Sequence, residues 1–390
     1  MSSKMKKNSK TLSPILVQWE FPLNFAIVRV MLKDAIDLST LRRVLVIKLR
    51  HHGDVLLTSP VFSVLKNHAP HLEIDALVYQ DTAEMLSRHP AISQLHTIDR
   101  KWKSAGVLAQ AKAEWQLLSA LRARRYDLIV HLTEHPRGAW IKRLTGASWS
   151  VAPKPSAANR FIRHSHTHFY PVVCANHRHT VESNLDALRR IGVYPAAGER
   201  GLTLVPGGET ENFIEGLLAE HRLKGKDFIH LHPTSRWLFK CWPAERMATL
   251  IASLQAQGHR FVITAAPAAE ELTMVKSILA GLPQPVVDLS GQLSLTQLAA
   301  LTARARLFIG VDSAPMHIAA AMGTPTVALF GPSGEIEWGP WQVPHRILTS
   351  AHACRPCGND GCGGGKMSEC LSDIPVENAL NAAEELLRIP

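Results

Sequence analysis

Three short stretches of the chain combine the residue types that bind phosphates and move protons. They are Lys48–Pro60 (KLRHHGDVLLTSP), His232–Pro243 (HPTSRWLFKCWP) and Gly310–Ser333 (GVDSAPMHIAAAMGTPTVALFGPS). In each, polar side chains lie directly after a short apolar run with the composition of a buried strand. Ligands of parallel sheets bind at the carboxyl ends of the strands, so we expect all three stretches at such an edge.

Asp54 is the candidate proton acceptor in the first stretch. It follows the strand predicted at Val44–Lys48 and the loop Leu49–Gly53, at the start of a helix, where its carboxylate would face a cleft. A carboxylate in such a position could act as a general base and take the proton of an attacking hydroxyl. The alternative is a helix cap or first-turn acid, because aspartate favours that position.

The second stretch carries candidate phosphate ligands. Thr234 and Ser235 follow the strand predicted at Phe228–Leu231 and offer hydroxyl and backbone N–H groups, and Lys240 adds a positive charge. Such groups could bind the phosphates of a ligand. The alternative for Lys240 is a solvated surface position, the usual place of a lone lysine.

The third stretch is a strand, a helix and a second strand, predicted at Leu307–Val311, Ala314–Met322 and Pro325–Phe330. Asp312 and Ser313 stand at the first junction, and His317 lies about one turn into the helix. The three side chains would therefore face a ligand at the sheet edge. The alternatives are a helix cap for the first two and an interior position for the histidine.

These stretches belong to two series of alternating strands and helices. The first series begins near Arg43, the second begins after Lys226, and the segment Pro195–Gly208, rich in glycine and proline, is the predicted linker. The segment Pro153–Cys174 is predicted as a loop over the cleft. Alternation of this kind predicts an α/β fold of two tandem doubly wound, Rossmann-like parallel-sheet domains facing across a cleft. The predicted divisions are an extension at 1–40, domains at 41–205 and 206–375, and a C-terminal helix at 376–390 that packs back across the domains.

Composition limits the possible partners. The chain has 390 residues, 46% of them hydrophobic, and a net charge of +10, which favours anionic partners. No run of 18 uncharged apolar residues predicts a membrane span. Glu20, Pro22 and Arg29 interrupt an N-terminal segment that faintly resembles a signal peptide, so a cytoplasmic protein is expected. Four tyrosines and no aromatic-basic repeat argue against nucleic acid.

Four cysteines lie close together near the C-terminus, at Cys354, Cys357, Cys362 and Cys370. Four thiolates among glycines could hold a structural zinc ion. The spacing is not the paired C-x2-C pattern, and the alternative is a loop of free or redox-labile thiols.

The three stretches, in this order on the two halves of the chain, resemble the bacterial lipopolysaccharide core heptosyltransferases. The resemblance covers nearly all of residues 41–390, and VLVIKLRHHGDVLLTSPVFSVLK is most similar to the members that add a side-branch heptose, heptose III. It implies a GT-B fold, ADP-heptose as donor substrate, and inversion at the sugar carbon, with no metal and no other cofactor. It also implies a phosphorylated lipid A–core acceptor and peripheral, electrostatic attachment to the anionic inner membrane.

The resemblance also implies roles for individual residues. Asp54 becomes the base, and Thr234, Ser235 and Lys240 match the phosphate ligands. Asp312 would bind heptose hydroxyls, with the backbone N–H groups of Ser313 and Ala314 near the phosphates and His317 beside them. Glu270, or Glu271 next to it, resembles the acid that binds the ribose. Side chains that could meet acceptor phosphates, or remain solvated surface charge, are Arg50, His51, His52 and Arg137.

Other functions remain as alternatives. A core heptosyltransferase could use heptose I or heptose II as its acceptor, and a binding protein for anionic glycans would also use a basic surface. A nucleotide-dependent oxidoreductase is disfavoured, because KLRHHGD holds one glycine where G-x-G-x-x-G is required. No Asp-x-Asp occurs in the chain, so leaving-group charge would have to be offset by lysine, arginine and helix N-termini.

Overall fold

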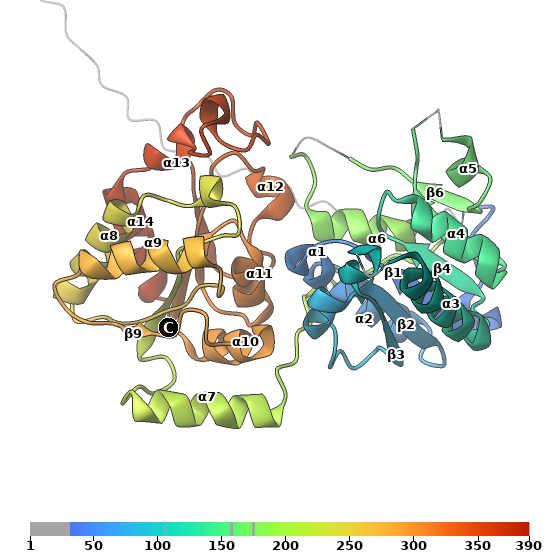
Figure 1. Ribbon diagram of the computed structural model, residues 1–390, viewed down its shortest axis with the longest axis horizontal. Coiled ribbons are helices and arrows are strands. Elements are labelled where there is room, and N and C mark those ends of the chain that lie inside the picture. The colour runs from blue at the N-terminus through green and yellow to red at the C-terminus, as the bar shows by residue number, and fades with distance from the viewer. Residues whose placement is uncertain (1–31, 105, 157–158, 174–175, 390) are drawn as a thin grey trace, which may run out of the picture.

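The computed structural model describes residues 32–104, 106–156, 159–173 and 176–389. Two α/β domains lie side by side, each built on a six-stranded parallel sheet with helices on both faces (Figure 1). Residues 1–31, most of the predicted N-terminal extension, lie outside the described part.

The first sheet has the strand order β3-β2-β1-β4-β5-β6. Its central strand β1 (Arg43–Ile47, RVLVI) pairs in parallel with β2 and β4, and its four apolar residues are fully buried between two core clusters. The other strands are β2 (Glu73–Tyr79), β3 (Gln94–Ile98), β4 (Leu128–His131), β5 (Trp149–Pro153) and β6 (His168–Tyr170). The helices are α1 (His52–Leu56), α2 (Ser59–His68), α3 (Val107–Arg124), α4 (Pro136–Thr145), α5 (Arg160–Arg163) and α6 (Thr180–Arg190), with 3-10 turns at Leu38–Thr40, Gln80–Met85, Arg100–Ser104 and Ala197–Glu199.

The second sheet repeats that plan, with the order β12-β11-β10-β7-β8-β9. Its strands are β7 (Phe228–His232), β8 (Arg260–Ile263), β9 (Val287–Asp288), β10 (Leu307–Val311), β11 (Thr326–Leu329) and β12 (His345–Leu348). Its helices are α7 (Gly208–Glu220), α8 (Ala244–Ala256), α9 (Ala269–Ala280), α10 (Leu295–Arg304), α11 (Ala314–Ala321), α12 (Glu335–Trp338), α13 (Glu369–Ser372) and α14 (Val376–Leu387), with 3-10 turns at Leu238–Lys240 and Cys362–Gly364. Counted from its own first strand, each sheet has the order 3-2-1-4-5-6, which opens a ligand crevice at the carboxyl ends of its central strands.

The structure corrects several predicted elements. The single helix expected after Gly53 is two helices, α1 and α2, because Pro60 in the first turn of α2 cannot donate to the preceding turn. The predicted loop Pro153–Cys174 contains α5 and β6. α7 was not predicted: it begins at the last residue of the predicted linker, and its Ile214 and Leu218 pack in a core cluster of the second domain. β12 was not predicted either.

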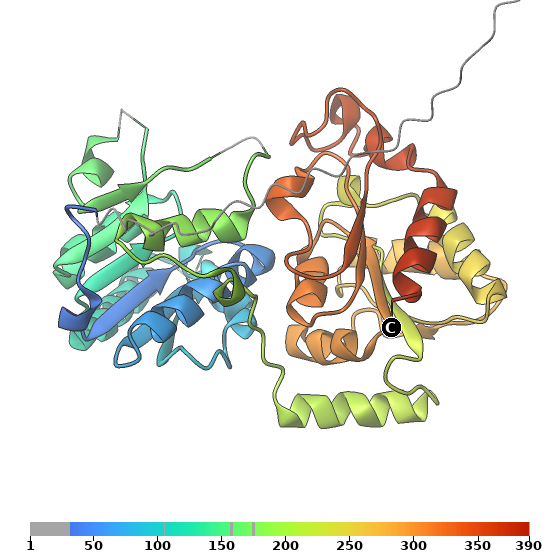
Figure 2. The same cartoon turned by 180° about the vertical axis from the view of Figure 1, so that it is seen from behind.

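Both ends of the described chain depart from the predicted divisions. Residues 32–40 belong to the first domain, since the N–H of Ile36 donates to the carbonyl of Ile191 and Arg190 pairs with Asp34. α14 joins the core of the second domain through Ala379, Ala383 and Leu386 rather than packing across the two domains. Figure 2 shows this helix, in red, against the second domain.

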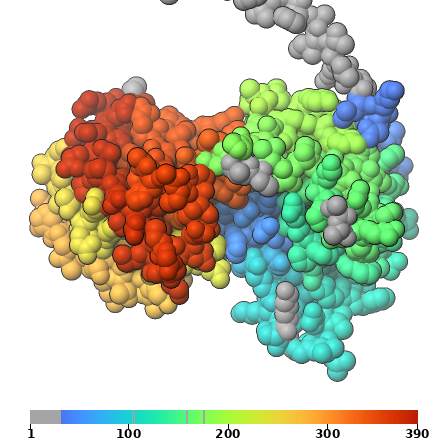
Figure 3. Space-filling model, turned by 90° about the horizontal axis from the view of Figure 1, so that it is seen from above, coloured from blue at the N-terminus to red at the C-terminus, as the bar shows by residue number. Residues whose placement is uncertain are grey.

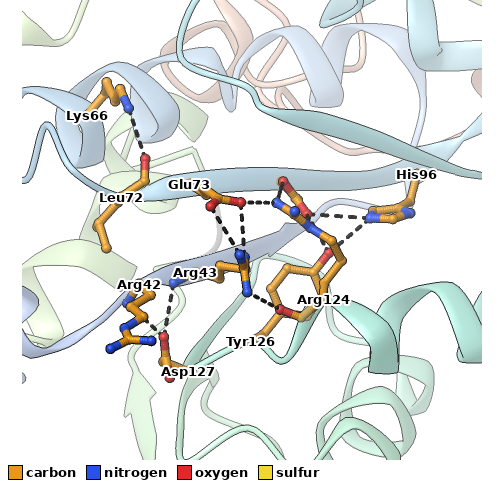
Figure 4. Close-up of polar contacts among 10 residues, drawn as sticks. Arg42, Arg43, Lys66, Leu72, Glu73, His96, Arg124, Tyr126 and Asp127 are labelled. Atoms are coloured by element: carbon orange, nitrogen blue, oxygen red, sulfur yellow. Dashed lines mark hydrogen bonds and ion pairs between the residues drawn. The ribbon is translucent and has the colours of Figure 1, made fainter.

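A network of hydrogen bonds and ion pairs stabilises the edge of the first domain that lies away from the cleft. Arg124, at the end of α3, donates through Nε to the fully buried Asp75 at 2.6 Å and through Nη2 to Glu73 at 2.7 Å. The hydroxyl of Tyr126 also donates to Asp75, at 2.7 Å. Figure 4 shows Arg124 between Glu73 and Tyr126, with Arg43 on the other side of Glu73. Burial works to raise the pKa of Asp75, but hydrogen bonds from His96, Arg124 and Tyr126 hold that pKa below its usual value.

Candidate active site

A cavity of about 1200 Å³ lies between the carboxyl ends of the two sheets, and all three polar stretches line it. The first domain contributes the segment after β1, and the second contributes the segments after β7 and β10. Figure 3 shows the two lobes from above. The three stretches therefore converge as the sequence predicts.

Two side chains of the first domain cap helices of the second and so fix one wall of the cavity against the other. A carboxylate oxygen of Glu84 accepts from the N–H groups of Leu295 and Thr296 at 2.9 and 3.3 Å, at the start of α10. The amide oxygen of Asn176 accepts from the N–H groups of Ile336 and Glu337 at 2.8 and 2.9 Å, at the start of α12. Each cap satisfies helix donors that would otherwise have no partner.

Asp54 lies in the first turn of α1 and lines the cavity. The N-cap position belongs to His51, so the carboxylate of Asp54 is not the cap. The Nζ of the buried Lys48, at the end of β1, lies 4.0 Å from Oδ1 of Asp54. Lys48 also donates to the carbonyl of Leu132 and to Oδ1 of Asn184, both at 3.2 Å. Burial lowers the pKa of Lys48, and the charge of Asp54 opposes that shift.

Across the cavity, charged and hydroxyl groups of the second domain form two pairs. Lys240 donates to the carboxylate of Asp312 at 2.6 Å, at the carboxyl end of β10. The hydroxyl of Thr234 donates to Glu271 at 2.7 Å, and both residues are buried. Ser235 is buried beside Thr234 and also lines the cavity. The lysine predicted as a phosphate ligand is therefore held in the cavity by an acidic partner.

The two adjacent acids on α9 have different surroundings. Glu271 is 4% exposed and lines the cavity, whereas Glu270, the residue preferred from the sequence, is exposed and is not among the residues that line it. Successive helical side chains point about 100° apart, so only one of the two can face the cavity. The acid in position to meet a ligand is Glu271.

α11 brings Ser313, Ala314 and His317 to the cavity wall. The imidazole of His317 is buried, and its Nδ1 has no hydrogen-bond partner in the described part of the chain. Burial lowers the pKa of His317 to about 4, against the opposing charges of Asp312 and Asp54. The ring is therefore neutral at physiological pH.

The predicted acceptor ligands divide into two groups. Arg50, His51 and His52 line the cavity, and the ring of His51 meets the edge of Trp237 with centroids 5.5 Å apart. A ring nitrogen of His52 lies 2.9 Å from the carbonyl of Asp81. Arg137 lies elsewhere, in a groove between α3 and α4, where it pairs with Glu114 at 2.6 Å.

Among the polar side chains of the cavity that sequence reasoning missed are Lys48, Asn184 and Glu337. Lys48 stands inside a stretch already selected, and its place at the end of β1 could have marked it. Glu337 follows β11, another strand that ends at the cleft, but a glycine- and proline-rich segment precedes it. Burial raises the pKa of Glu337, and the nearby Asp54 and Asp312 add to that shift.

The four clustered cysteines lie away from the cavity lining. Cys354, Cys357 and Cys362 are exposed, Cys370 is buried, and all four are free thiols. Among the residues that the structure describes, no group of three or more histidines, cysteines and acids is arranged to hold a metal ion. The zinc hypothesis has no preformed site to support it.

Solved structures share this architecture. The chain matches a glycosyl transferase family 9 protein of Veillonella parvula with a TM-score of 0.76 at 24% identity, over 92% of this chain and 99% of that one. It matches the E. coli heptosyltransferase WaaC, solved with ADP-2-deoxy-2-fluoro heptose, with a TM-score of 0.68 at 19% identity, over 88% and 99% of the two chains. Two Rossmann-like domains facing across a cleft define the GT-B class of glycosyltransferases.

Sequence comparison identifies the family. Residues 114–367 match the model of glycosyltransferase family 9 (heptosyltransferase). The chain is 34% identical over 344 residues to lipopolysaccharide heptosyltransferase 3 of E. coli K12, and this alignment covers 87% of this chain and 96% of the relative. It is 27% identical over 330 residues to lipopolysaccharide heptosyltransferase 1 of Pseudomonas aeruginosa, and this alignment covers 82% of this chain and 87% of the relative. The chain belongs to glycosyltransferase family 9.

Proposed function

We propose that the chain transfers heptose from ADP-heptose to a heptose of the lipopolysaccharide inner core, as side-branch heptose III, by an inverting reaction that needs no metal. One observation carries the proposal: Asp54 from the first domain shares a single cavity with Lys240, Asp312 and Thr234 from the second. The similarity to lipopolysaccharide heptosyltransferase 3 supports the choice of acceptor.

In this reaction Asp54 takes the proton of the acceptor hydroxyl as its oxygen attacks the anomeric carbon. Lys48, fixed by two hydrogen bonds, places its positive charge 4.0 Å from the carboxylate of Asp54. We assign a single displacement, in which the acceptor oxygen approaches the anomeric carbon on the face opposite the departing ADP. Inversion follows from that arrangement.

The second domain binds the donor and stabilises the departing ADP. Lys240 turns from Asp312 toward the diphosphate, which leaves Asp312 free to accept hydrogen bonds from heptose hydroxyls. The backbone N–H groups of Ser313 and Ala314, at the start of α11, add a partial positive charge beside the phosphates. Glu271, held by Thr234, accepts from the ribose hydroxyls.

The acceptor enters along the first domain. Arg50 and His51 line that side of the cavity and would meet the phosphates of the lipid A–core acceptor. Such an acceptor is embedded in the inner membrane, so we place the protein at its cytoplasmic face, attached peripherally. No helix in the described ranges is long and apolar enough to cross a membrane.

The test is transfer of labelled heptose from ADP-heptose, in EDTA, to two core acceptors that differ only in the side-branch heptose. We expect transfer to the acceptor that lacks this heptose and none to the completed one. Transfer only to acceptors that lack heptose I or heptose II would assign a different step. Tight donor binding with no transfer to any core acceptor would favour a glycan-binding protein, and loss of transfer in EDTA would contradict the metal-free reaction.

A further inference from the structure

Two helices of the first domain carry aromatic side chains that its core does not use. α3 has 18 residues, and among its described side chains only Leu121 is fully buried. Trp115 on α3 is 66% exposed and Trp140 on α4 is 54% exposed. Both line an apolar groove of about 570 Å³ between the two helices. An exposed apolar surface of this kind marks an interaction site.

The segment of the chain that forms this groove is strongly basic. Residues 101–164, which contain α3, α4 and α5, hold 12 lysines and arginines against three acidic residues. This segment accounts for nine of the ten net positive charges of the chain. Of the three acids, Glu114 lies in the groove and is paired with Arg137. The surface is therefore complementary to a strongly anionic partner.

Aromatic and basic residues share one exposed face of α3. Lys112, Trp115 and Arg122 follow one another at intervals of three and seven residues, so their side chains project from the same side of the helix. All three are exposed. Helices that lie in a membrane interface combine these features, because the ring enters the headgroup layer while lysine and arginine meet lipid phosphates.

The groove adjoins the active-site cavity. Leu132, Thr133 and Glu134 line the cavity, and the next three residues, His135 to Arg137, line the groove. α4 begins shortly after β4 ends, at the edge of the sheet that also carries Asp54, and α3 follows β3 beyond the 3-10 turn at Arg100–Ser104. In Figure 1 both helices lie in the first domain on the side remote from the second. A planar surface against them could lie beside the cavity without meeting the second domain.

We propose that the face formed by α3 and α4 docks on an anionic phospholipid bilayer, with Trp115 and Trp140 in the headgroup layer and the surrounding lysines and arginines on lipid phosphates. The purpose of this contact rests on the proposed function, since it would present a lipid-linked acceptor at the cavity next to the groove. The contact itself does not depend on transfer and is tested without it.

The experiment is sedimentation of the full chain with vesicles of phosphatidylcholine, with or without one third phosphatidylglycerol. The native chain binds the anionic vesicles and binds the neutral ones far more weakly. Changing Trp115→Ser with Trp140→Ser lowers the partition coefficient on anionic vesicles about tenfold, because the buried ring area is lost. Changing Lys112→Glu with Arg122→Glu lowers it at least about tenfold at low salt.

Matched controls come from the second domain. Phe213→Ser removes an aromatic ring that is 50% exposed on α7, and Lys224→Glu with Lys276→Glu reverses two exposed charges. Both controls should bind vesicles as the native chain does. The proposal is overturned if the native chain does not bind anionic vesicles, if the α3–α4 variants bind as well as native, or if the controls lose as much. It is also overturned if the tryptophan variant only converts a native oligomer to a monomer in equilibrium sedimentation.

Transfer to a water-soluble, deacylated core acceptor separates this proposal from the proposed function. The α3–α4 variants should keep native rates with that acceptor, which also shows that they fold. If the α3–α4 variants lose transfer and vesicle binding to the same degree, these residues are needed for the fold, and the docking proposal is overturned. If the native chain transfers nothing to any acceptor yet binds anionic vesicles through this face, the proposed function fails and the docking surface stands.

Discussion

Gly53 and His317 meet across the boundary between the two domains. A methyl group added at the α-carbon of Gly53 would lie 2.7 Å from Cδ2 of the His317 ring, closer than real side chains approach. Gly53 immediately precedes Asp54, and His317 lies on α11 beside the donor groups. The absence of a side chain at residue 53 thus sets how closely the base can approach the donor.

Gly53→Ala should therefore slow transfer while leaving the fold intact. The added methyl group would push α1 away from α11, and a displacement of about 1 Å at a reacting centre can cost about a hundredfold in rate. Steady-state transfer rates and thermal unfolding would be measured together. Gly216→Ala on α7 is the matched control, because nothing lies within 4 Å of its added methyl group. Native rates in Gly53→Ala would show that the contact does not position the base.

Lys240→Ala should weaken binding of ADP-heptose about tenfold or more. The change removes a charge-assisted hydrogen bond to the diphosphate and leaves Asp312 without its 2.6 Å partner. Titration calorimetry with ADP-heptose measures the loss directly. Lys276→Ala, an exposed lysine on α9, should bind the donor as native does. Equal affinity in both variants would remove Lys240 from the donor site.

Asp75→Asn should lower the free energy of unfolding by about 3 kcal/mol, because it leaves Arg124 without its buried partner. The pKa of Asp75 is lowered in the folded state, so its stabilising contribution is present above the ordinary value of 3.8 and is lost as the pH falls through the folded pKa. Urea unfolding of the variant measures the change. Glu73→Gln, whose carboxylate is more exposed, should cost about 1 kcal/mol or less. Equal losses of unfolding free energy in the two variants would show that the exposed pair with Glu73 contributes as much as the buried pair with Asp75.

Stability should also fall as the pH drops from about 6.5 toward 4. Burial lowers the pKa of His317 and His166 to about 4 and that of His131 to about 3, so the unfolded chain binds protons that the folded chain does not. At pH 5 each of these imidazoles would cost about 2 kcal/mol relative to neutral pH. Urea unfolding at pH 7 and pH 5 measures the combined effect of these and the other buried histidines, and His131→Gln should reduce the difference. An unchanged pH dependence in that variant would mean that His131 is protonated in the folded state.

The central strands of both sheets could be predicted from the sequence, but the edge strands β6 and β12 could not. β1 and β10 are continuous apolar runs, because a strand buried on both faces leaves few positions for polar residues. β12 pairs on one side only, and its residues His345–Leu348 are partly exposed, so no apolar pattern marks it. The order of the strands depends on contacts between distant segments, which local patterns do not specify.

The candidate site divides in the same way. Asp54, Thr234 and Asp312 could be found because each follows a predicted strand at its carboxyl end. The choice between Glu270 and Glu271 depends on which face of α9 lies toward the cavity, and the sequence does not specify that. Arg137 shares the basic character of the cavity residues, but its partner Glu114 comes from another helix, and only the folded chain shows that pairing.

Transfer by Asp54→Asn tests the central claim most directly. The change keeps the size of the side chain but removes the proton acceptor, so transfer from ADP-heptose to the core acceptor should fall by about a thousandfold. Affinity for ADP-heptose should stay near native, because the donor groups lie on the other domain. A variant that transfers heptose at the native rate with normal donor affinity would contradict the account and leave Asp54 as a first-turn helix residue.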